Sequence, residues 1–268
     1  MVVKRLAAPA PGDPAELTDP HSFAWWRRDA DVQAAGLLDS TRGLRGPGPS
    51  AVDEDADGIT IFQPWVEDAA NNGLVIARCL GTFATEPVEH LHLARNQLRD
   101  RMRRVAHNGG WPTLARTTVA DVADRLWQRR GDLLDQLDTL PQVLQHGDPT
   151  PANMLGRSGD DVVAIDWGTL GTGPVGADLG YFSLSAREAL APLVDAHLLG
   201  LARGTATREQ VETGARVTAV FTAFNCAEWA LARAAAGEGA LAAKFRHPAV
   251  APYLRSLQRL FPEIEKLL

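Results

Sequence analysis

The chain has 268 residues, 45% of them hydrophobic, which is enough for one large or two modest domains with a sizeable core. Its formal net charge of −6 argues against nucleic acid as the main partner. The apolar runs are too short and interrupted to cross a membrane, and the first residues lack the long apolar core of a secretory signal. The cysteines, Cys79 and Cys226, match no metal-binding spacing, so we expect a reducing, cytoplasmic setting.

The first 70 residues predict a small lobe that contains strands. Residues 2–6, VVKRL, favour a strand because β-branched residues are frequent there. Residues 19–38 favour a helix, with aspartate and proline at its start and apolar residues along one face. Residues 39–58 are rich in Gly, Pro and Asp and are expected to form a loop. Residues 58–68, GITIFQPWVED, predict a strand that ends at its proline.

The rest of the chain, residues 71–268, predicts a larger helical lobe. Thr207 and Gln210 have the spacing of a capping box at the start of one long helix. Helical spacing of apolar residues extends over residues 74–84, 88–106, 118–140, 185–203, 207–236 and about 248–259. We therefore expect an α+β protein of two lobes joined near residues 64–72, with a ligand site in the cleft between them.

The stretch LQHGDPTPANML, residues 144–155, is too rich in proline to be a helix. One interpretation is a surface turn, because Asp, Pro, Thr and Asn all favour turns. The other is a rigid loop that presents a base and a metal ligand. The residues that follow predict a β-hairpin centred near residues 159–160. Asn153 and Asp166 lie about equally far from that centre, so they should meet at its open end, with Cβ atoms about 5 Å apart.

An amide oxygen and a carboxylate at that distance suit Mg²⁺, which prefers oxygen ligands and completes its shell with water and phosphate oxygens. Asp148 lies just before this predicted site, is held by Pro149 and Pro151, which follow it, and is placed to orient a hydroxyl group and take its proton. Phosphoryl transfer asks a protein mainly for positioning and for neutralisation of charge. The residues therefore indicate a site for a magnesium-bound nucleotide.

The motifs HGDPTPAN, IDW and DLG resemble the catalytic core of the aminoglycoside phosphotransferase and choline kinase-like family. The strong resemblance covers about residues 144–182, and the helices on either side fit in order and length only. It implies a protein kinase-like fold, ATP as the phosphate donor and Mg²⁺ as the metal. It also implies that Asp148 is the catalytic base and that Asn153 and Asp166 are the magnesium ligands.

Further residues take expected roles from the same resemblance. His146 and Asp178 match positions that support the catalytic loop structurally. The run FQPWVED should lie beside the adenine of the nucleotide, so the candidate contacts there are Gln63, Trp65, Val66 and Glu67.

The small lobe of this family carries a lysine that contacts phosphates and pairs with a carboxylate on a helix. Lys4 is the candidate lysine and Asp29 its candidate partner, and Asp31 is a weaker one. The plainer alternative for Lys4 is an exposed strand residue. Asp29 is one methylene shorter than the glutamate usual in the family, so we expect a pair that is longer or bridged by water.

The family's Gly-rich hairpin, which covers the phosphates, is not evident, because only three residues precede Lys4. The small lobe therefore looks truncated. The alternatives are an upstream start, a different cover for the phosphates, a partner protein that completes the lobe, or a non-catalytic kinase-like binding module. Because Asp148, Asn153 and Asp166 are all present, we predict an active enzyme.

The resemblance predicts transfer of the γ-phosphoryl group to a hydroxyl of a small molecule, such as an aminoglycoside-like compound, a sugar or another metabolite. The alternative acceptor is a Ser or Thr of a biosynthetic precursor peptide. The acceptor should bind among the helices near residues 86–140 and 185–236, where Glu228 and Trp229 are candidates for its wall.

Two further patterns admit plainer interpretations. The arginines of residues 95–104 either bind an acidic substrate or form a solvated basic face, and the second is the stronger interpretation. The sequence GTGPVG, residues 171–176, has the spacing of a dinucleotide-binding motif, but a lone match is weak evidence. We expect it to form a flexible segment of the activation type.

Overall fold

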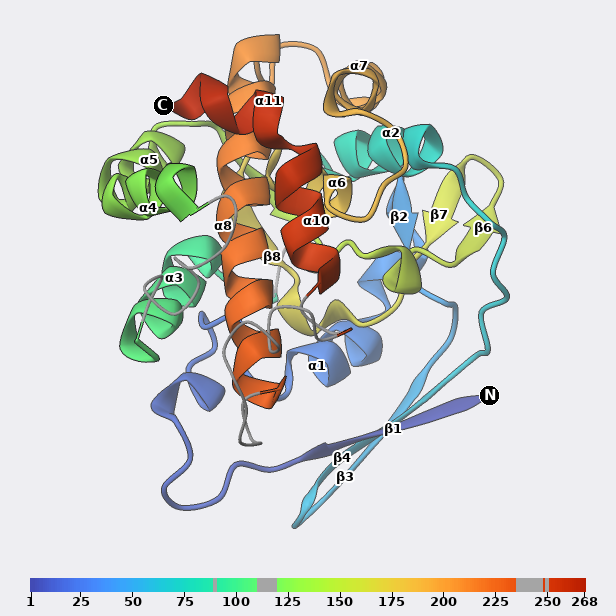
Figure 1. Ribbon diagram of the computed structural model, residues 1–268. Coiled ribbons are helices and arrows are strands. Elements are labelled where there is room, and N and C mark those ends of the chain that lie inside the picture. The colour runs from blue at the N-terminus through green and yellow to red at the C-terminus, as the bar shows by residue number, and fades with distance from the viewer. Residues whose placement is uncertain (89–90, 110–119, 235–247, 249–250) are drawn as a thin grey trace.

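The computed structural model describes residues 1–88, 91–109, 120–234, 248 and 251–268. Figure 1 shows a small sheet beside the N-terminus at one end of the molecule and a larger group of helices at the other. The expected α+β class is confirmed. The parts of the sequence predictions that involve residues 89–90, 110–119, 235–247 or 249–250 lie outside the described residues.

The small sheet is antiparallel, with the strand order β1-β4-β3. Its strands are β1 (Val2–Ala7), β3 (Ala51–Asp55) and β4 (Gly58–Gln63). Side chains alternate between the faces of a strand, so Ile59 and Ile61 share one face, where they pack against Ala30 of helix α1 (Arg28–Ala35). Lys4 of β1 is aligned with Ile61, so its side chain lies on this same face, toward α1.

Helix α1 lies within the range predicted to be helical, residues 19–38, but it is shorter than expected and the predicted start at Asp19 is wrong. The chain forms turns before Arg28. The carboxylate of Asp19 accepts the backbone N–H of His21 at 2.9 Å, which is a local turn rather than a helix cap. The turns expose the carbonyl groups of Pro20 and Ser22 to the guanidinium group of Arg28, and these tertiary contacts replace the hydrogen bonds of a helix.

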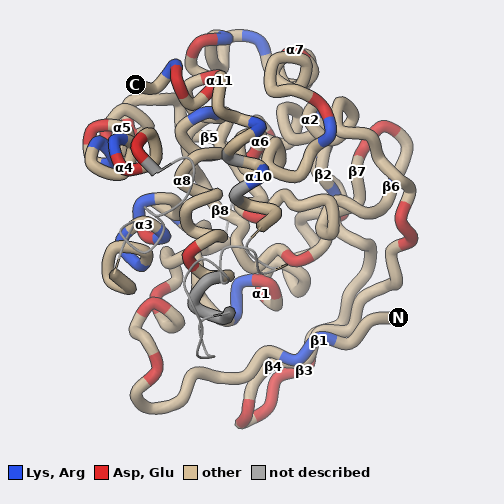
Figure 2. The backbone as a smooth tube through the Cα atoms, in the orientation of Figure 1, with Lys and Arg blue, Asp and Glu red and all other residues tan. Residues whose placement is uncertain are grey.

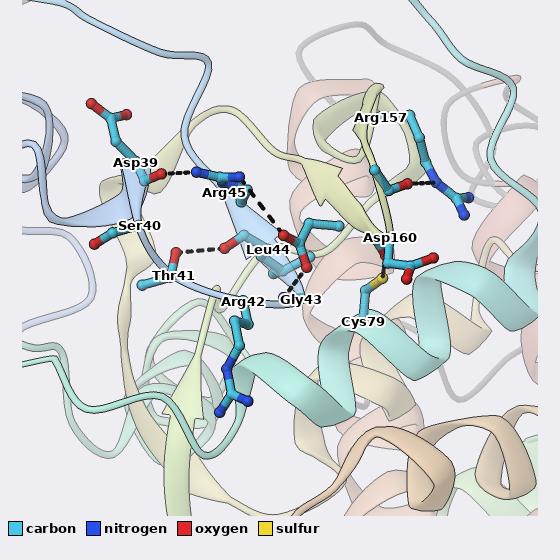
Figure 3. Close-up of polar contacts among 12 residues, drawn as sticks. Asp39, Ser40, Thr41, Arg42, Gly43, Leu44, Arg45, Cys79, Arg157 and Asp160 are labelled. Carbon is cyan, nitrogen blue, oxygen red and sulfur yellow. Dashed lines mark hydrogen bonds and ion pairs between the residues drawn. The ribbon is translucent and has the colours of Figure 1, made fainter.

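The loop expected over residues 39–58 is also wrong, because it contains strands β2 (Leu44–Arg45) and β3. Strand β2 pairs in parallel with β7 (Asp161–Val163), which pairs with β6 (Gly156–Ser158) in the predicted hairpin. The hydroxyl of Thr41 donates to the carbonyl of Leu44 at 2.6 Å (Figure 3). Gly43 has a φ of 78°, and a Cβ atom there would lie 2.3 Å from the carbonyl oxygen of Cys79, so this approach to helix α2 (Gly73–Phe83) requires glycine.

A long helix runs through the middle of the larger lobe (Figure 1). This helix, α8 (Arg208–Ala234), begins with the predicted capping box, in which the N–H of Thr207 donates to the side chain of Gln210 at 2.8 Å. The other helices are α2 (Gly73–Phe83), α3 (Gln97–His107), α4 (Ala120–Gln128), α5 (Arg130–Asp138), α6 (Ala177–Ser183), α7 (Leu190–Gly200), α10 (Ala251–Arg259) and α11 (Phe261–Ile264). Among the described helices, none combines the length and hydropathy that a membrane crossing needs.

Two expected helices are interrupted. The helix predicted over residues 88–106 begins only at Gln97, because Ala94 instead forms an isolated β-bridge with Gly171. The helix predicted over residues 118–140 divides at Arg129 into α4 and α5.

The segment Gly171–Pro174, expected to be flexible, is strand β8, which pairs with β5 (Gln142–Gln145). The expectation of flexibility is therefore wrong. A Cβ atom at Gly171 would lie 2.4 Å from the carbonyl oxygen of Ala94, and one at Gly173 would lie 2.5 Å from the side chain of Gln145. These glycines permit close packing between segments, and the strand pairing then fixes the chain that precedes helix α6.

Candidate active site

The proline-rich stretch forms a rigid loop rather than a surface turn. Strand β5 leads into it, and it ends in a single 3-10 turn, Pro151–Asn153. The amide nitrogen of Asn153, which is buried, donates to the backbone carbonyl of Asp148 at 2.9 Å and to its carboxylate at 3.0 Å. Asn153 therefore holds the backbone and the side chain of Asp148 together.

His146 joins this loop to the strand that precedes Asp166. Its ring is fully buried and packs on the ring of Trp167, with 4.6 Å between centroids. Its Nδ1 atom accepts the N–H of Asp148 at 3.3 Å, and its Nε2 atom lies 3.0 Å from the carbonyl oxygen of Ile165. A hydrogen on Nε2 satisfies both contacts. The ring thereby links the Asp148 loop to the Asp166 segment.

Asp178, in the first turn of α6, holds the loop from behind. Its carboxylate accepts the backbone N–H groups of His146 at 2.7 Å and of Gly147 at 3.0 Å. Burial raises the pKa of Asp178, while His146 and the two N–H groups act in the opposite direction. Gly147 has a φ of 84°, and a Cβ atom there would lie 2.5 Å from the carbonyl oxygen of Thr169. The turn before Asp148 therefore needs both a glycine and this acid.

Asn153 and Asp166 lie at the open end of the β6–β7 hairpin. The N–H of Ile165 donates to the carbonyl of Asn153 at 3.0 Å, which brings the neighbouring Asp166 alongside. The side-chain nitrogen of Asn153 already donates to Asp148, and no described residue donates to the side-chain oxygen of Asn153. The side chain of Asp166 is half exposed. One amide oxygen and one carboxylate fit the preference of Mg²⁺ for oxygen ligands.

The described residues contain no group of three or more His, Cys, Asp or Glu side chains that could hold a metal ion. Two protein ligands leave most of the coordination shell of Mg²⁺ to water and phosphate oxygens, as is usual where the metal accompanies a nucleotide.

Lys4 connects the first strand of the chain to this site. Its Nζ atom lies 2.7 Å from a carboxylate oxygen of Asp29 and 2.7 Å from one of Asp166. The expected pair with Asp29 is thus a direct contact, not a longer or water-bridged one. Burial alone would lower the pKa of Lys4, but the two carboxylates outweigh it and raise the pKa. Asp31 instead pairs with Arg27 at 3.3 Å, so the structure does not favour it as the partner of Lys4.

The segment between the small sheet and α2 lies against the end of the catalytic loop. The N–H of Ala69 donates to the carbonyl of Leu155 at 2.8 Å, and the side chain of Asn71 donates to the carbonyl of Gly156 at 2.9 Å. Gln63 is buried at the end of β4. The remaining candidate contacts line a groove of about 390 Å³ beside Gly156: Trp65, Val66 and Glu67.

Sequence reasoning missed Tyr181, which lies three residues after Asp178 on α6. Burial raises the pKa of Tyr181, and the neighbouring Cys226 and Asp148 raise it further, partly through a hydrogen bond to Asp148. The hydroxyl therefore keeps its proton and can donate a hydrogen bond to the carboxylate of Asp148. The three-residue spacing on a helix, which turns Tyr181 and Asp178 to one side, was the available signal.

Arg101, on α3, contacts the same loop. One guanidinium nitrogen donates to the carbonyl of Gly147 at 3.0 Å, and the group lies 5.6 Å from the ring centre of Tyr181 and 5.2 Å from that of Phe23. Figure 2 shows that several Lys and Arg positions, coloured blue, lie along α3. Arg99, Arg103 and Arg104 pair with acidic residues, so for these three the structure agrees with a solvated, ion-paired face. No ion pair is described for Arg95.

The candidate wall residues of the acceptor site lie on α8. The carboxylate of Glu228 accepts the side-chain N–H of Asn108 at 3.2 Å, and Trp229 is 52% exposed. Among the described residues, neither side chain has a hydrogen bond or ion pair to Asp148, so their part in acceptor binding stays a prediction.

A family model described as "Phosphotransferase enzyme family" matches residues 65–212. The match spans more than half of the chain, and the chain therefore belongs to this family. A comparison of the sequence with curated proteins gave no match.

Solved structures show the same fold. A choline/ethanolamine kinase family protein from Mesorhizobium loti is 13% identical, with a TM-score of 0.60 over 89% of this chain and 82% of its own. The choline kinase LicA from Streptococcus pneumoniae, in its complex with AMP, is 15% identical, with a TM-score of 0.58 over 94% and 83%. The GDP and kanamycin complex of APH(2")-IIia is 13% identical, with a TM-score of 0.56 over 100% and 94%.

At these identities the likeness shows the fold alone, which is the kinase-like fold predicted from the motifs. Family and fold together define a phosphotransferase enzyme with the kinase-like fold.

Proposed function

We propose that the chain transfers the γ-phosphoryl group of ATP to a hydroxyl group of a small molecule, with Asp148 as the catalytic base. The observation that carries this proposal is the double contact of Lys4 with Asp29 and Asp166, each at 2.7 Å. It brings a cation from the small sheet to a carboxylate at the open end of the catalytic hairpin. Phosphate groups need a cation beside them, and a divalent metal ion needs a carboxylate, so a bound metal–nucleotide complex needs both charges together.

Asp148 orients the acceptor hydroxyl and takes its proton. The acceptor oxygen forms a bond to the transferred phosphorus while the bond from phosphorus to the ADP oxygen breaks. Asn153 and Tyr181 hold the Asp148 carboxylate in one orientation, which reduces the entropy lost on reaching the transition state. Asn153 and Asp166 are the residues that would hold Mg²⁺, which would draw negative charge from the phosphate oxygens.

Lys4, held by Asp29, is proposed to contact the phosphates, and the segment with Gln63, Trp65, Val66 and Glu67 to lie beside the base. We place the nucleotide-binding lobe at residues 1–70 and the catalytic and acceptor lobe at residues 71–268. The segment that joins β4 to α2 supports a boundary there, although β2 extends from the first part to pair with β7.

The similar solved structures indicate which acceptors and nucleotides to test first. Those neighbours include a choline kinase, a complex with AMP, and a complex with GDP and kanamycin. Choline, kanamycin and simple sugars are therefore the first acceptors to test, with ATP and GTP as donors.

The test measures ADP release by the purified protein with ATP, Mg²⁺ and each acceptor, together with the phosphorylated product by mass spectrometry. We expect Asp148→Asn to bind the magnesium–ATP complex normally and to lower kcat by about 10²- to 10⁴-fold. Normal turnover by Asp148→Asn would contradict the role of the base. Failure of the wild type to bind ATP would contradict the proposed function.

A further inference from the structure

Arg28, at the start of α1, is a buried arginine that bonds four backbone carbonyl groups. Arg28 is 1% exposed. Its three guanidinium nitrogens donate at 2.7–3.0 Å to the carbonyl oxygens of Pro20, Ser22, His92 and Gly168. These four acceptors come from three separate segments of the chain.

Burial of this charge is costly. Within the described part of the chain, no carboxylate lies within ion-pair distance of Arg28, and the guanidinium lies 5.5 Å from the ring centre of Trp25. Burial lowers the pKa of Arg28 to about 10. A buried charge without a paired acid generally destabilises a fold, even when carbonyl groups satisfy its hydrogen bonds. Its place beside the candidate site suggests a role beyond stability.

The Gly168 carbonyl connects Arg28 to the candidate magnesium ligand. Gly168 is two residues after Asp166, which has a left-handed backbone with a φ of 63°. Trp167, between them, is fully buried. A left-handed backbone at a residue other than glycine persists when its surroundings hold it. The hydrogen bond from Arg28 to Gly168, at 2.9 Å, is one such constraint.

Arg28 also precedes Asp29, the other carboxylate that contacts Lys4. Adjacent residues of α1 therefore reach the Asp166 segment in two ways: Arg28 through the Gly168 carbonyl, and Asp29 through the Lys4 ammonium group. The remaining donors of Arg28 tie the same helix end to the turns at residues 20–22 and to residue 92. The guanidinium thus sets the distance between α1 and the hairpin end.

We propose that Arg28 is a positioning residue, which holds α1 and the Asp166 backbone so that Lys4, Asp29 and Asp166 form one site before any ligand binds. This inference rests on the proposed function for its kinetic consequence, but its structural consequence is independent of activity. Loss of the guanidinium frees the Asp166 segment. The magnesium requirement then rises and kcat falls, while binding of the acceptor is retained.

The variants are Arg28→Lys and Arg28→Gln, with Arg27→Gln as the matched control. Arg27 adjoins Arg28, but it is partly exposed and pairs with Glu54 and Asp31. Hydrogen–deuterium exchange on the ligand-free proteins should show faster exchange in residues 164–170 for both Arg28 variants. Arg27→Gln should exchange there like the wild type.

With substrates, we expect Arg28→Gln to lower kcat by about 100-fold, the loss that a misplacement of about 1 Å can cause. The Mg²⁺ concentration for half-maximal rate should rise about tenfold, and the KM for the acceptor should change less than threefold. Arg28→Lys, which keeps the charge, serves as the informative variant if Arg28→Gln does not fold. It should recover part of kcat.

Unchanged exchange at residues 164–170 and unchanged magnesium dependence in a folded Arg28 variant would overturn the proposal. So would a loss that appears only in the KM for the acceptor. A wild type without magnesium-dependent transfer would instead refute the proposed function, and the exchange experiment would still test the position of α1.

Discussion

His197, on α7, makes the stability of this protein depend on acid. The residue is 2% exposed, and neither ring nitrogen has a hydrogen-bond partner of good geometry in the described structure. Burial lowers the pKa of His197 to about 4, from an ordinary value near 6.5. The folded protein therefore keeps this ring neutral at a pH where the unfolded chain protonates it.

The direction and size of the effect follow from linkage. Between pH 6.5 and 4 the unfolded chain binds one more proton at His197 than the folded protein, so stability falls as the pH falls through that range. A pKa difference of one corresponds to about 1.4 kcal/mol, so the full loss is about 3 kcal/mol. At pH 5 the protein should already have lost about 2 kcal/mol of this stability relative to pH 7.

Urea unfolding at pH 7 and pH 5, followed by circular dichroism, measures the loss. His197→Leu removes the titrating group, and His107→Gln is the control, because His107 is exposed at the end of α3. The wild type and His107→Gln should lose about 2 kcal/mol more than His197→Leu between the two pH values. If all three proteins lose the same free energy of unfolding, the reasoning about His197 is wrong.

The other predictions concern the site and the helix packing. Lys4→Met should lower kcat/KM for ATP by about 100-fold in steady-state kinetics, because a preorganised cation is lost, whereas Lys266→Met, which removes an exposed lysine, should have no effect. Tyr181→Phe should lower kcat about tenfold with an unchanged KM for ATP, since a hydrogen bond to a charged group contributes about 1.5–3 kcal/mol. Gly81→Ala should reduce the free energy of unfolding by about 1–3 kcal/mol, because its Cβ would lie 2.1 Å from a carbonyl oxygen of α7. Gly131→Ala, in open space on α5, should instead raise it by about 0.5–1 kcal/mol. Normal kinetics in the two active-site variants, or destabilisation by both alanine variants alike, would contradict these expectations.

The sequence by itself determined the local chemistry around Asp148. The residues concerned lie within about 35 positions of one another, and their spacing depends on one tight loop, one short hairpin and one helix start. Turn-forming residues and alternating apolar residues specify such elements without help from distant contacts. The placement of Asn153 beside Asp166 and of Asp178 behind the loop therefore agreed with the expected geometry.

Only the tertiary structure decided how the first strand and helix meet that loop. The contact between Lys4 and Asp166 spans 162 residues, and the carbonyl groups bonded by Arg28 extend as far as Gly168. Local propensity favoured a helix over residues 19–38 and a flexible segment at residues 171–176. Hydrogen bonds to the buried guanidinium of Arg28 outweighed this propensity in the first segment, and pairing with β5 outweighed it in the second. Local preferences amount to a few tenths of a kcal/mol per residue, so buried tertiary contacts override them.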